Sequence, residues 1–517
     1  MLGVVEIILV VSGLTVGLYC YLTRTFDYWK SRGVEGPRPV VLFGTGKDIM
    51  TNKYSMGDYL NNVYKIWRKE PFFGIYLRQT PVLVLNDLDL VKDVLIKDFS
   101  KFADRGTPMH EKVERLSAHL FNLEPARWRP LRLKLSPVFT SGKLKEMFYL
   151  LLECVEHWDE YIGRMIENTG SDEIVVEFRE LTAKFATDVI GVCAFGLQMN
   201  AMASEDSIFR IMGRRIFTFN WRNMLRFRLR TIAPGLYDIV GRLLADKEME
   251  DFFIDTMTQT MEHRKKNNVV KHDFIDLLMA IRDHPEKMSN IELTDNILAA
   301  QLFVFFIAGF ETSSTTMSNA LYELALDHEI QDKLRAEIKT EMSRTGGVIE
   351  YEGVKDMKYL DMVFQETIRK YPPVTFLMRK ATEAYTFEGP SKNKLLTIEK
   401  DQKVWIPIYA IQRDPEYFPK PDVFDPERFT EEAAKSRHPM TDLSFGDGPR
   451  NCIGKRFGVM QTKVGLFKIL NSYRVETCDK TQIPYVNNPK SGSYVIPEKR
   501  HFRLENLISR PKITYFW

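Results

Sequence analysis

The apolar segment 289–327, SNIELTDNILAAQLFVFFIAGFETSSTTMSNALYELALD, constrains the fold of this chain more than any other feature. Its spacing predicts one long helix, and Thr294 or Asp295 can cap the first turn with a side-chain oxygen. Apolar residues lie on most sides of this helix, which is therefore too apolar to be exposed. The rest of the chain must cover it.

Helical periodicity dominates the region around this segment, between about residues 140 and 370. Strand patterns cluster near the ends of the chain, in the segments 74–87, 395–408, 473–477 and 500–506. Beyond residue 45 the sequence contains no low-complexity linker and no internal repeat, so residues 46–517 are predicted to form a single domain. We therefore expect a mostly α (α+β) protein with a large helical domain and smaller β-sheet regions.

An apolar run at the amino terminus, VVEIILVVSGLTVGLYCYL, extends from Val4 to Leu22. As a helix it would span roughly 28 Å, close to the roughly 30 Å of bilayer hydrocarbon. Glu6 lies at its outer end, where a carboxylate can reach the lipid headgroups. We predict a transmembrane anchor over residues 1–22, followed by a basic, proline-rich hinge over residues 23–45.

A cleaved signal peptide is the alternative interpretation of this run, but such a peptide begins with a basic stretch. Here no Lys or Arg precedes the apolar residues, whereas Arg24, Lys30 and Arg32 follow them. By the positive-inside rule the chain after the anchor stays in the cytosol. We therefore expect an anchor in the endoplasmic-reticulum membrane, with the folded domain on the cytosolic face.

A second basic and apolar segment, Trp221–Pro234, leaves two interpretations open. It places several arginines among Trp, Met, Leu and Phe side chains. This pattern fits a patch that lies on anionic lipid. It fits a solvated helix face equally well.

Composition and cysteine spacing narrow the classes of function. The formal net charge is +3 and no Lys/Arg-dense stripe dominates a long segment, which argues against nucleic acid as a partner. The five cysteines lie far apart without a C-x-x-C pair, which argues against a disulfide framework or a zinc site. Cys20, Cys154 and Cys193 lie in apolar or helical surroundings that are typical of packing residues. Cys452 differs from them.

Cys452 lies in the loop FGDGPRNCIGKRFG, residues 445–458. A thiolate metal ligand needs a low thiol pKa, which nearby cations and a helix amino terminus both favour. Arg450 precedes the cysteine, Lys455 and Arg456 follow it, and an amphipathic helical run begins directly afterwards. These residues favour a thiolate at position 452.

The glycines of the same loop, Gly446, Gly448 and Gly454, allow tight turns that bring the backbone close to a flat cofactor. A plain glycine-rich turn before a helix would explain them as well. It explains neither Phe445 nor the spacing between the arginine and the cysteine.

The pattern F-x-x-G-x-R-x-C-x-G resembles the haem-binding signature of cytochromes P450, and it is matched at Phe445, Gly448, Arg450, Cys452 and Gly454. The resemblance implies the cytochrome P450 fold and haem b as the cofactor. It also implies that Cys452 is the axial ligand of the haem iron, and that the protein is a monooxygenase that uses O2.

Ala308-Gly309-Phe310-Glu311-Thr312-Ser313, inside the long predicted helix, resembles the oxygen-activation motif of the family. Steps of three or four place on one helix face Gln301, Phe305, Ala308, Thr312 and Thr316. The resemblance implies that Ala308 and Gly309 leave room for O2, that the Thr312 hydroxyl hydrogen-bonds the bound oxygen, and that Glu311 relays protons. Taken alone, a threonine bonded to its own helix and an exposed glutamate would explain the same letters.

The segment Trp128-Arg129-Pro130-Leu131-Arg132 resembles the W-x-x-x-R helix of the family. The resemblance implies that the haem propionates are bound by Trp128, Arg132, Arg379 and Arg450, since a guanidinium matches a carboxylate geometrically. One departure is Gln412, where many relatives carry His. It leaves open which hydrogen bond forms at that edge of the haem.

Glu366 and Arg369, followed by Arg428, resemble the buried ion network that holds the proximal core of the family. As a bare helix pair at i, i+3, Glu366 and Arg369 would contribute only a few tenths of a kcal/mol, on the order of 0.3. The resemblance assigns the three residues a structural role.

The cysteine loop, AGFETSS and FTSGKLKEMFYL (139–150) are most similar to microsomal insect enzymes of family six, particularly those of moths. That resemblance implies xenobiotic substrates, namely plant allelochemicals and insecticides. The predicted pocket walls, largely apolar or aromatic, favour small apolar substrates; they are Phe121, Phe305, Ala308, Val374, Phe376, Leu377, Ser493 and Tyr494.

Electrons must come from a separate protein, because the sequence contains no Rossmann fingerprint and no flavin domain. The resemblance implies that NADPH–cytochrome P450 reductase delivers them from NADPH, with cytochrome b5 as a further candidate partner. Basic residues would steer such an acidic flavoprotein; the candidates are Arg127, Arg129, Lys134, Lys143, Lys455 and Arg456.

We therefore expect insertion of one oxygen atom from O2 into small apolar substrates, by hydroxylation or epoxidation. A haem-thiolate isomerase, dehydratase or lyase on the same fold is an alternative, but such enzymes can dispense with Glu311 and Thr312. A non-catalytic membrane protein that binds haem or lipid is another. It would leave the oxygen-activation motif unused.

Overall fold

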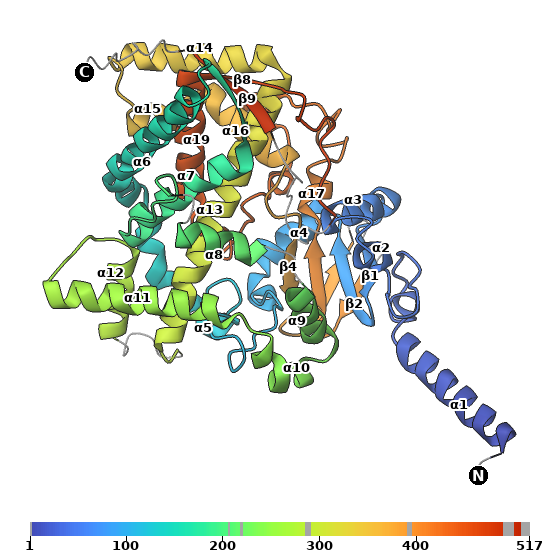
Figure 1. Cartoon of the computed structure of the whole chain (residues 1–517). Coiled ribbons are helices and arrows are strands. Elements are labelled where there is room, and N and C mark those ends of the chain that lie inside the picture. The colour runs from blue at the N-terminus through green and yellow to red at the C-terminus, as the bar shows by residue number, and fades with distance from the viewer. Residues whose placement is uncertain are drawn as a thin grey trace.

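The computed structural model describes residues 3–204, 207–217, 221–284, 291–389, 395–489 and 501–507. Helices dominate, as predicted, and the small sheets lie mainly on the side from which the amino-terminal helix projects (Figure 1). The helices of the body are α2 (Lys47–Met50), α3 (Met56–Trp67), α4 (Leu88–Lys92), α5 (Pro125–Leu135), α6 (Ser141–Glu167), α7 (Phe178–Phe195), α8 (Ile208–Phe217), α9 (Trp221–Ile232), α10 (Pro234–Val240), α11 (Lys247–Asn267), α12 (Phe274–Asp283), α13 (Asp295–Leu326), α14 (His328–Arg344), α15 (Tyr351–Asp356), α16 (Lys358–Lys370), α17 (Ile408–Ile411), α18 (Glu431–Lys435) and α19 (Lys455–Ser472).

The long apolar helix is confirmed as α13, which runs through the core and packs against α7, α11 and α19. Thr294 caps it, because its side chain accepts a hydrogen bond from the Ile297 N–H at 3.3 Å. The first two residues of the predicted segment, 289–290, lie outside the described residues. Most of α13 is buried, which explains why so apolar a helix belongs to the body.

The predicted strand segments are also confirmed. A four-stranded sheet has the order β1 (Phe72–Leu77), β2 (Thr80–Leu85), β7 (Lys403–Ile406), β4 (Leu377–Lys380), and only its β2–β7 pair is parallel. The segment 395–408 divides between two sheets, because β6 (Leu395–Ile398) pairs with β5 (Tyr385–Glu388) instead of with β7.

A three-stranded sheet joins distant parts of the chain, in the order β3 (Glu173–Glu177), β9 (His501–Asn506), β8 (Tyr473–Glu476). The sequence pattern did not indicate β3, since this short strand lies between two long helices. Its pairing partner β9 is more than three hundred residues away in the sequence. Long-range pairing, not local periodicity, determines this strand.

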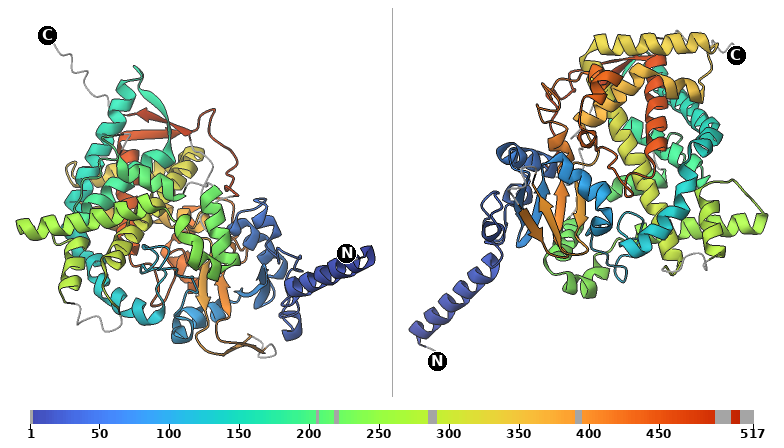
Figure 2. Two further views of the ribbon diagram at one scale, coloured as in Figure 1. Left: turned by 60° about the horizontal axis from the view of Figure 1, so that its bottom comes forward. Right: turned by 180° about the vertical axis from the view of Figure 1, so that it is seen from behind.

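Helix α1 (Val4–Thr23) projects from the body, and none of its residues is buried (Figures 1 and 2). It is long and apolar enough to cross a membrane, as is the mostly buried α13. The chain after α1 packs closely on the sheet, because Trp29 is buried and its indole N–H donates to the Ile75 carbonyl at 3.1 Å. The predicted hinge is therefore attached to the body over part of its length.

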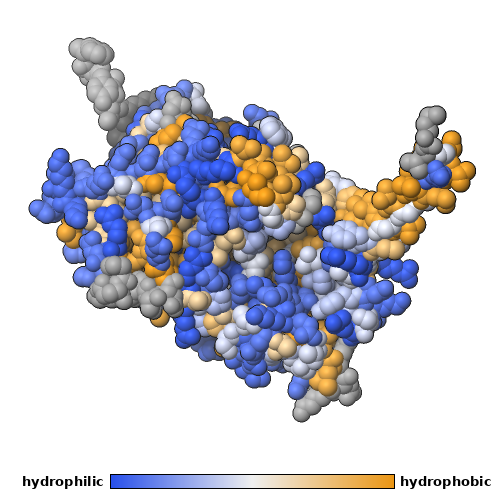
Figure 3. All heavy atoms as spheres, turned by 90° about the horizontal axis from the view of Figure 1, so that it is seen from below, coloured by the Kyte–Doolittle hydropathy of each residue, from blue (hydrophilic) through white to orange (hydrophobic). Residues whose placement is uncertain are grey.

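The underside of the body carries exposed apolar side chains, on the face from which α1 extends (Figure 3). Those of α9, of α10 and of the short 3-10 turn Gly241–Leu243 that follows are Trp221, Met224, Leu225, Leu236, Ile239 and Leu243. Two arginines of α9, Arg226 and Arg230, turn inward to Glu114, with N–O distances of 3.7 and 3.2 Å. The exposed surface of α9 is thus partly apolar. This favours the interpretation as a patch on lipid over that as a solvated helix face.

Candidate functional site

The cysteine loop is held by its own backbone before α19 begins. The Cys452 N–H donates to the Phe445 carbonyl at 2.8 Å, and the Gly446 N–H donates to the Leu443 carbonyl at 2.8 Å. Gly446 and Gly448 have φ angles of 64° and 70°, the left-handed region that favours glycine. A Cβ atom at Gly448 would lie 1.9 Å from the Leu95 carbonyl oxygen. These two glycines are therefore required by the turn, as predicted.

Gly454 differs from the other two glycines. It is the N-cap residue of α19, with φ −90° and ψ 14°, a conformation that residues with side chains also adopt in turns. The nearest atom to a Cβ placed there is a Phe139 ring carbon at 3.9 Å, an ordinary contact. The turn does not explain this glycine, in contrast to our expectation. A close approach by another group would explain it.

The Cys452 side chain is exposed, yet burial of its surroundings raises the pKa of its thiol above the ordinary value. Both observations hold if the sulfur faces an enclosed recess. The Gly454 N–H and the charges of Arg132, Arg105 and Lys455 act in the opposite direction and do not outweigh burial. The protein groups alone therefore do not give Cys452 the low thiol pKa that we expected. A cation bound to sulfur would supply the remaining stabilisation of a thiolate.

Four arginines come together beside this loop, namely Arg105, Arg132, Arg379 and Arg450. Burial and mutual repulsion lower the pKa of Arg105, Arg379 and Arg450 to about 9 each. The hydrogen bonds that their guanidinium groups donate within the described chain go to main-chain carbonyls and to the Asn451 amide oxygen. Among the described residues, the cluster therefore carries positive charge without a hydrogen-bonded carboxylate partner.

The individual arginines differ in how much of the guanidinium remains open. Within the segments that the structure describes, Arg450 has Nε and Nη1 buried without a hydrogen-bond partner, and Arg379 has Nε in the same state. The Arg450 guanidinium lies 4.4 Å from the ring centroid of Trp128, which is 4% exposed. Arg132 instead uses both terminal nitrogens on Asn451, at 3.0 and 2.9 Å. Its position indicates that it holds the loop at least as much as it serves a ligand.

Arg105 is a member of this cluster that the sequence did not indicate. Its Nη2 donates to the Arg450 carbonyl at 3.1 Å, and its Nη1 donates to the Phe121 carbonyl at 3.0 Å. It lies in a loop with no periodic pattern, so nothing in the local sequence marks it. Folding alone brings it to Cys452.

The predicted face of α13 is open at one place. Ala308 is exposed, although most of α13 is buried, and the Thr312 hydroxyl one turn later donates to the Ala308 carbonyl at 2.7 Å. Gln301, on the same face, is fully buried and holds the loop before α5 by accepting from the Leu120 N–H at 2.8 Å. The open part of this face is thus confined to the neighbourhood of Ala308 and Thr312.

Two residues of the predicted oxygen-activation motif face α7 instead. A Cβ atom at Gly309 would lie 2.5 Å from the Ile190 side chain, so this glycine permits close packing of α13 on α7. We had expected Gly309 to leave room for oxygen, but its position against Ile190 does not provide that room. Glu311 is 4% exposed, and its carboxylate accepts a hydrogen bond of 2.6 Å from Arg179 of α7. It is an ion-paired core residue and not the exposed glutamate of the alternative interpretation.

The predicted pocket residues divide into two groups. Phe121 is exposed, with the Arg105 guanidinium 4.1 Å from its ring centroid, and Leu377 lies next to Gly446. Val374 is partly exposed between α16 and β4. Phe121 and Leu377 remain near the cysteine loop, and Ala308 lies on the open face of α13.

Two others are core residues, which corrects the sequence prediction. Phe305 is 8% exposed and stacks on Phe139 with a centroid distance of 5.3 Å. Phe376 is 4% exposed and packs on Trp405 of the four-stranded sheet, with a centroid distance of 4.3 Å. Both therefore contribute to packing. Ser493 and Tyr494 lie outside the described residues.

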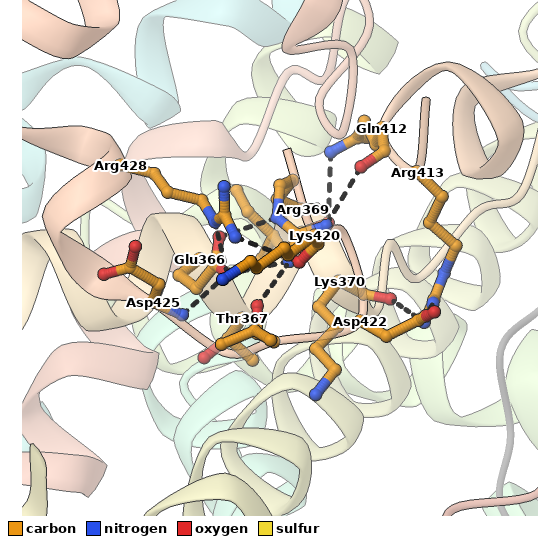
Figure 4. Close-up of polar contacts among 12 residues, drawn as sticks. Glu366, Thr367, Arg369, Lys370, Gln412, Arg413, Lys420, Asp422, Asp425 and Arg428 are labelled. Atoms are coloured by element: carbon orange, nitrogen blue, oxygen red, sulfur yellow. Dashed lines mark hydrogen bonds and ion pairs between the residues drawn. The ribbon is translucent and has the colours of Figure 1, made fainter. Parts of the chain in front are cut away.

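The ion network below the cysteine loop is buried. Arg369 Nε is 2.6 Å from Glu366 Oε2, and the two side chains are 1% and 0% exposed (Figure 4). Arg428 Nε lies 3.5 Å from the same carboxylate, and the Asp425 N–H donates to it at 2.9 Å. The network joins α16 to the turn at Pro426–Phe429. It brings together the three residues to which the sequence assigned a structural role.

The residues beside Cys452 fit a haem group. A flat dianionic ligand would place carboxylates on the open guanidinium nitrogens of Arg450 and Arg379, which otherwise stay buried and unpartnered. The surface of Gly454 admits a planar group, and the Cys452 sulfur is a suitable iron ligand.

Comparison with known proteins agrees with this geometry. Cytochrome P450 6a2 of Drosophila melanogaster is 39% identical over 500 residues, which cover 95% of this chain and 97% of that protein. Cytochrome P450 6A1 of Musca domestica is 39% identical, covering 93% of this chain and 94% of that protein. Cytochrome P450 6k1 of Blattella germanica is 38% identical, with 94% of each covered. These relatives confirm the resemblance to insect enzymes of family six.

A sequence model of the cytochrome P450 family matches residues 34–503, nearly the whole chain after its amino-terminal helix. The helical body with small sheets is the fold that the resemblance implied. The chain therefore belongs to the cytochrome P450 family of haem monooxygenases.

Proposed function

We propose that this chain is a membrane-anchored haem-thiolate monooxygenase in which Cys452 ligates the haem iron. The observation that carries the proposal is the open Cys452 sulfur beside an arginine cluster that has no hydrogen-bonded carboxylate partner in the described part of the chain. A cationic metal would offset the burial that raises the pKa of the thiol, and two propionates would balance the arginines.

In this proposal the residues beside the cysteine loop have separate roles. Arg450 and Arg379 hold the propionates through their open nitrogens, and Trp128 supports the Arg450 guanidinium. Arg105 adds a further charge, while Arg132 orients Asn451 next to the ligand. When bound, the haem supplies an iron centre that activates O2, with electron density donated by the thiolate.

On the opposite side of the site, Ala308 keeps the face of α13 free of a large side chain. The Thr312 hydroxyl, which donates to the Ala308 carbonyl, holds a proton at the edge of this open face. Glu311 is bound to Arg179, so it serves the site by fixing α13 against α7 and not by an exposed carboxylate. This arrangement supports the monooxygenase over an isomerase or lyase, which can dispense with the threonine.

Small apolar substrates match the apolar side chains that remain near the site. Phe121, Leu377 and Ala308 offer apolar surface, and the similarity to insect enzymes of family six favours plant allelochemicals and insecticides. Exposed basic residues near the cysteine loop, Arg129, Lys455 and Arg456, suit an acidic electron donor such as NADPH–cytochrome P450 reductase or cytochrome b5.

Anchoring by α1 in the endoplasmic-reticulum membrane, with residues 46–517 on the cytosolic face, completes the proposal. It is supported by the exposed apolar surface of α1 and by the apolar side chains of α9 and α10 on the underside. These α9 and α10 side chains would then lie against the same membrane.

The spectrum of the purified full-length protein tests the proposal. We expect the red-shifted ferrous–CO band of a thiolate-ligated haem, and its loss in Cys452→Ala. A normal band in that variant would remove the ligand assignment. A spin-state titration with plant phenolics, furanocoumarins and insecticides tests the substrate class, and absence of any response across the panel would contradict it.

A further inference from the structure

One carbonyl group near the end of α16 has no donor within its own helix. The Ile368 carbonyl would normally accept from the N–H of the residue four positions later, but that residue is Pro372. Ile368 is 2% exposed, so water cannot easily replace the missing donor. A buried carbonyl of this kind needs a partner from elsewhere in the chain.

Gln412 and Ser444 supply that partner. The Gln412 Nε2 donates to the Ile368 carbonyl at 3.3 Å and to the Ser444 Oγ at 2.9 Å. The Ser444 hydroxyl also reaches the Ile368 carbonyl, at 2.9 Å. The three groups form a closed triangle, and Gln412 is 1% exposed.

This triangle is connected to Cys452 through the next residue of the loop. Ser444 directly precedes Phe445, whose carbonyl accepts the Cys452 N–H at 2.8 Å. The Phe445 ring also stacks on Phe364 of α16, with a centroid distance of 6.3 Å. The start of the cysteine loop is thus attached to α16 by one polar and one aromatic contact.

The other end of Gln412 is attached to the buried ion network. Its backbone carbonyl accepts a hydrogen bond of 3.0 Å from Arg369 Nη1, and Figure 4 shows Gln412 next to that guanidinium. Arg369 is in turn bound to Glu366. Gln412 therefore contacts the ion network with its backbone carbonyl. Its side chain contacts Ser444, the residue directly before the cysteine loop.

We propose that Gln412 is a positioning residue, which holds the Cys452 loop against α16 through Ser444. The inference rests on the proposed role of Cys452 as the iron ligand. Loss of the Gln412 side chain would leave Ser444 bound to the Ile368 carbonyl alone, and would leave that carbonyl with one donor fewer. The loop, and with it the sulfur, would then move more freely relative to the haem.

The test is the rate at which the ferrous–CO complex of the full-length holoenzyme loses its thiolate-type band at a fixed temperature. We expect Gln412→Leu to convert about fivefold faster than the unmodified protein, the factor that one ordinary hydrogen bond supports. Ser444→Ala should convert faster as well. Because both changes remove the same contact, the double variant should be little faster than either single variant.

Gln331→Leu is the matched control. Gln331 is equally buried and donates to the Leu324 and Val475 carbonyls at 2.8 and 2.9 Å, between α14 and β8. It should lower the temperature of unfolding without changing the rate of band conversion. Gln412→His should restore a near-normal rate at about pH 8, since a neutral imidazole keeps one donor and one acceptor.

Conversion of Gln412→Leu and Ser444→Ala at the unmodified rate would overturn the inference, as would equally fast conversion of Gln331→Leu. Either result leaves the proposed function intact. If the unmodified protein lacked a thiolate-type band altogether, the role of Cys452 would fail first.

Discussion

Glu311 of α13 and Arg179 of α7 form an ion pair between two helices that pack against each other in the core, with 2.6 Å between Oε1 and Nη2. The side chains are 6% and 29% exposed. Burial lowers the pKa of Arg179, but the charge and hydrogen bond of Glu311 outweigh it and raise that pKa. The pair therefore turns the Glu311 carboxylate toward α7, although Thr312 follows it directly in the sequence.

Removal of either partner should destabilise the fold. Breaking a buried pair costs roughly 3–5 kcal/mol, and since Arg179 is partly exposed we expect about 2 kcal/mol for Arg179→Gln or Glu311→Gln. The double variant should lose less than the sum of the two, because neither charge is then left alone. Denaturant unfolding of the holoenzyme measures this, and strictly additive losses would show that the pair is not coupled.

Thr312→Ala should uncouple the enzyme, so that NADPH is consumed and hydrogen peroxide is released in place of product. The reason is that the Thr312 hydroxyl is the proton-bearing group beside the open surface of Ala308. Thr316→Ala is the control, since Thr316 is buried and its hydroxyl donates to the Thr312 carbonyl at 2.8 Å. Comparable uncoupling in both variants would argue against a specific role for Thr312.

Two glycines of the cysteine loop, Gly448 and Gly454, should respond differently to a methyl group. Gly448→Ala must accommodate a positive φ and a contact with the Leu95 carbonyl, at a cost of about 1–3 kcal/mol or more. Gly454→Ala meets no protein atom closer than 3.9 Å. We expect it to keep the stability of the haem-free protein and to lower the haem content of purified samples. Full haem content in Gly454→Ala would mean that the haem does not approach this glycine.

The features that the sequence predicted correctly are local ones. The apolar period and the Thr294 cap determine α13, and positive φ angles determine Gly446 and Gly448, all within a few residues. The loop motif likewise indicated Arg450 beside Cys452. Such features depend on neighbouring residues, which a single sequence displays directly.

The features that it missed depend on which elements pack together. Phe305 and Phe376 turn into the core because Phe139 and Trp405 lie opposite them, and neither partner is close in sequence. Gly309 faces Ile190 of α7 for the same reason. Arg105 reaches Cys452 only when a loop without any periodic pattern folds over it. Spacing along one element cannot reveal these relations.

Acid should weaken the packing of α12 through Asp276. Burial raises the pKa of this carboxyl, but the Arg264 side chain and the N–H groups of Lys271 and His272 outweigh burial and hold that pKa below its ordinary value. A carboxyl whose folded pKa is lowered stabilises the protein above its unfolded pKa of about 4, and this contribution is lost as the pH falls through the folded value. The stability of the unmodified protein should therefore fall between about pH 5 and about pH 2, in part because of Asp276.

Asp276→Asn isolates that contribution, because an amide cannot titrate and Arg264, which is 3% exposed, loses one of its two ion pairs. We expect a lower temperature of unfolding near neutral pH and a smaller further decrease on acidification, measured by thermal melts across the pH range. Asp283→Asn is the control, since Asp283 lies exposed at the end of the same helix and should leave both quantities close to those of the unmodified protein. An acid dependence of Asp276→Asn as steep as that of the unmodified protein would assign the effect to other carboxylates.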